Sequence, residues 1–124
     1  MKIIKIRCAR CQETLTNAIR RFVLDLTHFD VGEEIVEKGH YCDGHEDISI
    51  AHNDRILVNN KDSKLLNHKL LKNYMGCCGY YDTNSLNQIC PNCQKGIATI
   101  VTECYTYHYL AIAKDKIIIE EVSE

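Results

Sequence analysis

The chain has 124 residues, which is the usual size of one domain. Fifteen basic and seventeen acidic residues give a formal charge of -2, so the strongly basic balance that attracts phosphate backbones is absent. No apolar run reaches the length of about eighteen residues that a membrane span needs, and charges interrupt residues 1–7 before they form a signal-peptide core. We therefore expect a single domain over residues 1–124, located in the cytoplasm, with no membrane partner and no nucleic acid as its default partner.

The eight cysteines are the most informative feature of the composition. In a secreted chain they would indicate a disulfide framework, but the charges in residues 1–7 lead us to expect no export. Under reducing conditions, metal binding or thiol chemistry is the usual reason for so many cysteines. The composition therefore favours a metal site.

The first predicted element is a strand over residues 2–7, because isoleucine is abundant there. The apolar residues of segment 14–29 fit one face of a helix, although residues 22–24 also suit a strand, and we expect a helix. Segment 30–47 contains several glycines and acidic residues. It predicts a loop with a short strand around Ile35.

Two strands are predicted at 48–51 and 55–58, joined by a turn of hairpin composition. The leucines of segment 59–73 have helix-like spacing and predict a short helix or an ordered loop. Strands follow at 97–103, 105–113 and 117–122. We expect these last three to form an antiparallel meander, with a turn at 114–116 between its second and third strands.

Two Cys-x-x-Cys pairs, Cys8/Cys11 and Cys90/Cys93, are the strongest functional signal. This spacing lets one tight turn direct both sulfurs at one ion, and two such turns complete the tetrahedron that zinc prefers. Pro91 follows the first cysteine of the second pair, where its fixed φ suits a turn. The alternatives are buried unliganded cysteines and a redox pair, but a redox pair usually begins a helix, whereas a β-rich run follows Cys93.

The distance between the pairs along the chain does not exclude a shared ion. Closing a loop of about 80 residues costs roughly 2 kcal/mol more than closing one of a dozen. Structural zinc contributes on the order of 10–16 kcal/mol. The predicted fold is therefore α+β and β-rich, with antiparallel strands organised around a zinc-ribbon-like site of four cysteines.

Cys77 and Cys78 are adjacent, and neighbouring side chains on an extended backbone point in opposite directions. One of them can join Cys104 in a second or alternative site, because both lie close in sequence to the pair at Cys90 and Cys93. Further possible ligands of a second metal are His68 and His108, which would leave Cys42 as a spare thiol. His40, Cys42 and His45 also form a cluster, in a glycine-rich segment.

Tyr105, Tyr107 and Tyr109 alternate along a predicted strand and so share one face. They suit either the stacking of a planar ligand or packing in the core with hydroxyl groups at its rim, and we expect the packing.

The cysteine motifs resemble those of a family of small uncharacterised bacterial proteins that carry a Gly-Cys-Cys-Gly segment followed by a Cys-x-x-Cys knuckle. The residues that carry the resemblance are Arg7, Cys8, Cys11, Leu15, Thr16, Gly76, Cys77, Cys78, Gly79, Asn87, Cys90, Cys93, Ala98, Thr99 and Cys104, which Tyr105 follows. The chain departs from the family pattern at Asp82, Ser85, Gln94 and Tyr105, where glycines and a tryptophan are expected. The resemblance implies a metal-binding protein and implies no activity.

Three functions are compatible with these features. The first is a non-catalytic zinc-stabilised module that binds a protein partner or regulates one, because no nucleophile, base and oxyanion site is evident beyond the cysteines. The second is a thiol- or zinc-dependent enzyme that uses Cys77 or Cys78. The third is a nucleic-acid-binding zinc ribbon with a basic patch near the first cysteine pair, formed by Lys5, Arg7, Arg10, Arg20 and Arg21. We favour the first.

Overall fold

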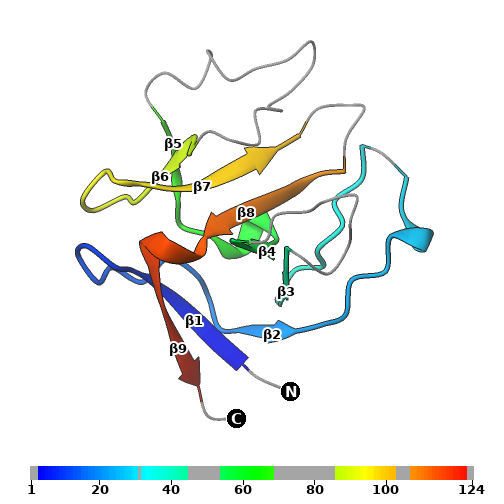
Figure 1. Cartoon of the computed structure of the whole chain (residues 1–124), viewed down its shortest axis with the longest axis horizontal. Helices are drawn as coiled ribbons and strands as arrows, with labels where there is room; N and C mark the ends of the chain where they lie inside the picture. Colours follow the sequence, from blue (N-terminus) through cyan, green and yellow to red (C-terminus); the bar gives the residue numbers. More distant parts are fainter. Residues whose placement is uncertain (1–2, 31, 45–53, 69–85, 103–106, 123–124) are drawn as a thin grey trace.

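The computed structural model describes residues 3–30, 32–44, 54–68, 86–102 and 107–122 (Figure 1). Nine strands form one sheet in the order β5-β6-β7-β8-β4-β3-β2-β1-β9. The strands are β1 (Ile3–Cys8), β2 (Ile19–Arg21), β3 (His40–Asp43), β4 (Arg55–Val58), β5 (Leu66–Asn67), β6 (Gln88–Ile89), β7 (Gly96–Val101), β8 (Tyr109–Ala113) and β9 (Ile117–Val122). The helical elements among the described residues are the short 3₁₀-helices η1 (Leu26–His28), η2 (Asn60–Asp62) and η4 (Lys114–Lys116).

The sheet curls back on itself. In the strand order, β8 and β9 are separated by four strands, yet only η4 joins them in the chain. Five strand spacings in a flat sheet measure about 24 Å, whereas the four peptide steps from Ala113 to Ile117 reach about 14 Å at full extension. The curl therefore brings β9 and its partner β1 back towards β8, as Figure 1 shows.

The two central strands, β4 and β8, are buried on both faces. On the inner face of the curl, Val58 and Ile112 pack with Ile6 of β1 in the larger core cluster, which we call the inner core. On the outer face, Leu57 and Ala111 belong to a second cluster, which we call the outer core. The segment before β3 contributes Leu24, Ile35 and Val36 to it. The alternation of successive side chains along each strand divides the apolar residues between these two cores.

The helix predicted over 14–29 is wrong. The backbone amide of Leu15 donates to Ile6, and those of Arg20 and Phe22 donate to Gly39 and Tyr41, so this segment lies extended against β1 and β3. Its apolar residues serve both cores: Leu15 and Ile19 belong to the inner cluster and Leu24 to the outer one. Pairing with neighbouring strands has therefore overridden the helical spacing of the sequence.

The strand predictions have different outcomes in different parts of the chain. The β-rich class and the strands at 55–58 and 117–122 are confirmed, and the strands predicted at 2–7, 97–103 and 105–113 correspond to β1, β7 and β8. β3 lies in a segment where we expected a loop, and the short β5 and β6 were not predicted. The strand predicted at 48–51 lies outside the described residues.

The C-terminal meander is partly wrong. β7 and β8 pair as an antiparallel hairpin, but β9 pairs along its whole length with β1, from Ile117 opposite Cys8 to Val122 opposite Ile3. The turn expected at 114–116 is the short helix η4, which leads the chain to the other end of the sheet. β8 and β9 are therefore consecutive in the chain but are not neighbours in the sheet.

Candidate metal centre

The first Cys-x-x-Cys pair forms a tight loop at the end of β1. The amide of Gln12 donates to the carbonyl oxygen of Cys8 at 2.8 Å, and the amide of Cys8 donates to the carbonyl oxygen of Glu13 at 2.9 Å. Gln12, directly after Cys11, has a φ of 66°. These contacts fold the chain into a loop that carries both sulfurs.

The second pair repeats this loop between β6 and β7. The amide of Gln94 donates to the carbonyl oxygen of Cys90 at 3.0 Å, and the amide of Cys90 donates to that of Lys95 at 2.9 Å. Gln94 has a φ of 64°, close to that of Gln12 in the first loop. Two segments far apart in the sequence thus adopt the same local structure, which we call the knuckle loops (residues 8–13 and 90–95).

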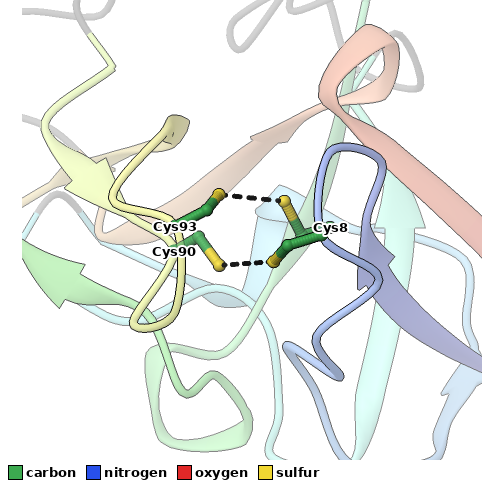
Figure 2. Close-up of side chains that lie close together, drawn as sticks. Cys8, Cys90 and Cys93 are labelled. Atoms are coloured by element: carbon green, nitrogen blue, oxygen red, sulfur yellow. Dashed lines mark hydrogen bonds between the residues drawn. The ribbon is translucent and has the colours of Figure 1, made fainter.

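The curled sheet places the two knuckle loops against each other. Figure 2 shows Cys90 and Cys93 of the second loop facing Cys8 of the first. The sulfurs of Cys8 and Cys93 are 3.6 Å apart, as are those of Cys11 and Cys90, and all four sulfurs lie within 4.8 Å of one another. The structure therefore brings together the four cysteines that the sequence predicts as ligands.

These distances suit a shared cation. Four sulfurs at the Zn–S distance of about 2.3 Å form a tetrahedron whose edges measure about 3.8 Å. A disulfide would need a separation of about 2.05 Å, and the four cysteines are free thiols. A cluster of four cysteines at this spacing can hold a metal ion.

The thiols differ in how readily they lose a proton. The side-chain amide of Asn92 and the backbone amide of Glu13 donate hydrogen bonds to Cys11 and lower the pKa of its thiol from 9.0 to about 6. Burial raises the pKa of Cys90 to about 12, although the amides of Cys93 and Asn92 donate to its sulfur. Cys11 therefore loses its proton more readily than Cys90, and a cation bound by all four sulfurs would have to displace the proton of any cysteine that is still a thiol.

The cluster joins the two ends of the sheet. The first knuckle loop follows β1, beside the edge strand β9, and the second joins β6 and β7 near the opposite edge. Cys8 and Cys90 are 0% exposed and belong to the inner core, against which Cys11 and Cys93 also pack. A metal ion here would fasten the curled sheet closed.

Basic side chains lie in and beside the two knuckle loops. A pocket of about 250 Å³ is lined by Ala9, Arg10, Lys95, Asp115 and Lys116. Four thiolates around a divalent ion leave a charge of about -2, which these cations would offset. The basic patch expected from the sequence is divided: Arg7 pairs with Glu120 at 3.3 Å, and Arg21 lines a different pocket.

The other expected ligands either lie outside the described residues or are described and not part of this cluster. Cys77, Cys78, Cys104 and His45 lie outside the described residues. Cys42 is buried in the outer core, and the ring of His40 packs edge-on against Phe22. Within the part of the chain that the structure describes, the four knuckle cysteines are the one group of potential ligands with metal-site spacing.

Tyr109 is a core residue, as expected. It packs in the outer cluster, and burial raises the pKa of its hydroxyl to about 12. Tyr107 packs against the same cluster, and Tyr105 is not among the described residues.

Asn92 is the site residue that sequence reasoning missed, since the only available signal was its position between the cysteines of the second pair.

Gln94→Gly is expected to raise the melting temperature by a few degrees. A left-handed φ costs a residue with a Cβ atom roughly 1–2 kcal/mol, and the greater freedom of glycine in the unfolded chain offsets about 0.5–1 kcal/mol of the gain. Thermal melts of the purified protein measure the change, with Gln94→Ala as the control that removes the side chain but retains the Cβ atom. Equal melting temperatures for the glycine and alanine variants would contradict the expectation.

In the described part of the chain, no helix has the length and apolar character that crossing a membrane requires. A scan against protein-family models, a search of curated proteins and a search of solved structures each find no match to this chain.

Proposed function

We propose that the four knuckle cysteines bind one structural zinc ion, and that the chain is a zinc-stabilised β domain of zinc-ribbon type. The observation that carries the proposal is the repetition of one loop structure at both cysteine pairs, with all four sulfurs within 4.8 Å. A tetrahedral site of four sulfurs suits zinc or iron. Zinc is favoured because it binds such sites without redox chemistry and is the common structural ion.

The ligand set favours a structural role for the ion. Catalytic zinc sites use three protein ligands and keep the fourth position for water or substrate, whereas structural sites are closed by four. The proposed site has four sulfurs, two of them fully buried. The role of the chain would then lie in a surface that the zinc holds in shape, which agrees with an interaction or regulatory module rather than an enzyme.

Membership of the bacterial family with the Gly-Cys-Cys-Gly segment remains a proposal that rests on sequence motifs. The four knuckle cysteines, which the chain shares with the family, lie in the described cluster. Its Gly76 to Gly79 segment and Cys104 lie outside the described residues.

Purified protein is expected to contain about one equivalent of zinc per chain by elemental analysis. The protein should be expressed in zinc-supplemented medium, with iron measured in the same samples. A colourless preparation agrees with zinc, because its filled d shell gives no visible absorption. Less than half an equivalent of zinc, or stoichiometric iron in its place, would overturn the assignment.

A further inference from the structure

A pocket of about 300 Å³ opens at the inner face of the curled sheet, lined by Ile4, Arg21, Tyr41, Asp43, Ile56, Lys114, Ile119 and Glu121. It contains none of the knuckle cysteines, so it is a feature separate from the candidate metal centre. Its lining comes from β1, β2, β3, β4, η4 and β9. The mouths of closed or curled sheets are common ligand sites, and this volume lies at the small end of their range.

We call this cavity the mouth pocket. The strand register explains which residues line it. Glu121 lies opposite Ile4, and Asp43 lies opposite Ile56. Because residues directly opposite each other share a face of the sheet, each pair sets a carboxylate beside an apolar side chain. The two isoleucines belong to the inner core, so the pocket is where that core meets solvent.

The charges at the mouth of the pocket balance. Arg21 and Lys114 are basic, while Asp43 and Glu121 are acidic. The ammonium group of Lys114 lies 2.9 and 2.8 Å from the two carboxylate oxygens of Asp43, which fixes one side of the mouth. A ligand with a single net charge gains no advantage from such a mouth, whereas a ligand with one positive and one negative group meets a partner for each.

The groups at the mouth have capacity for further hydrogen bonds. A guanidinium group has five N–H donors, and a carboxylate has about four acceptor sites, so an existing ion pair leaves positions that a ligand can use. The apolar wall also extends to the surface, since Ile119 of the edge strand β9 is 46% exposed. An aliphatic group packed against this side chain would remove apolar surface from water.

We infer that the mouth pocket binds a small zwitterion with an aliphatic body, such as an aliphatic α-amino acid. The pocket volume of about 300 Å³ is large enough to admit a molecule of this size. The ligand carboxylate accepts hydrogen bonds from Arg21 and Lys114, and its ammonium group donates to Asp43 and Glu121. The hydrocarbon chain packs against the isoleucines of the wall.

Calorimetric titration of the full-length, zinc-loaded chain with L-leucine tests the inference. Saturable binding is expected, with affinity about ten-fold lower for L-leucinol, which lacks the carboxylate, and for 4-methylpentanoate, which lacks the ammonium group. Glu121→Gln is expected to weaken leucine binding by a similar factor. Glu120→Gln is the matched control, because Glu120 is the neighbouring residue on β9 and pairs instead with Arg7.

Three results would overturn the inference: no saturable heat with L-leucine in the millimolar range, equal affinities for all three compounds, or equal effects of the two glutamate substitutions. Zinc content and melting temperature are measured on the same samples. A protein that holds zinc but does not bind leucine contradicts only this inference, whereas absence of zinc contradicts only the proposed function.

Discussion

Cys90→Ser is expected to abolish tight zinc binding and to leave the protein largely unfolded at 25 °C. Structural zinc contributes on the order of 10–16 kcal/mol, whereas a whole domain is stable by only about 5–15 kcal/mol. Cys90 is fully buried and its sulfur lies 3.6 Å from that of Cys11, so the substitution removes one of the four ligands inside the core. Circular dichroism and zinc content of the purified variant measure both effects.

Cys42→Ala is the matched control for this experiment. Cys42 is also fully buried, but it packs in the outer core away from the four-cysteine cluster. Its substitution removes one buried atom and is expected to cost about 1–2 kcal/mol, with full retention of zinc. If Cys90→Ser kept its zinc and melted at the same temperature as Cys42→Ala, the four-cysteine site would not be what holds the sheet closed.

Asn87→Ala is expected to destabilise the zinc-loaded protein by about 2–4 kcal/mol, because two buried backbone groups lose their partners. The side chain of Asn87 is 0% exposed. Its oxygen accepts from the amide of Ile100 at 2.9 Å, and its nitrogen donates to the carbonyl oxygen of Ile100 at 3.3 Å. The side chain thus supplies the bonds that a neighbouring strand would supply, just before the second knuckle loop.

Urea unfolding measures this change as a shift in the midpoint at constant slope. Asn60→Ala is the control, since Asn60 is exposed at the start of η2 and is expected to change stability by no more than about 0.5 kcal/mol. Equal stabilities of the two variants would show that the bonds of Asn87 to Ile100 contribute nothing beyond their replacement by water.

The parts of the fold that the sequence predicts are those with strong local signals. The isoleucines of β1 and β9 identify both strands, and β9 has the predicted bounds Ile117–Val122. The spacing of the cysteines identifies the two knuckle loops because a tight turn of this kind is a local structure. The cysteine cluster could therefore be predicted without knowledge of the strand order.

The errors arise where distant segments decide the structure. Leu15 and Leu26 have helical spacing, but Leu15 belongs to the inner core and Leu26 packs against the outer one, which local periodicity cannot indicate. The pairing of β9 with β1 depends on the curl of the whole sheet, so chain adjacency wrongly suggested a partner in β8. The mouth pocket could not be predicted for the same reason, because its wall combines six elements.

The central claim is that one zinc ion binds the two knuckle loops together through their four sulfurs. An anomalous difference map at the zinc absorption edge, from crystals of the zinc-loaded protein, tests it directly. The expected result is one peak about 2.3 Å from the sulfurs of Cys8, Cys11, Cys90 and Cys93. The absence of a peak among these sulfurs, or cysteines paired as disulfides, would contradict the claim.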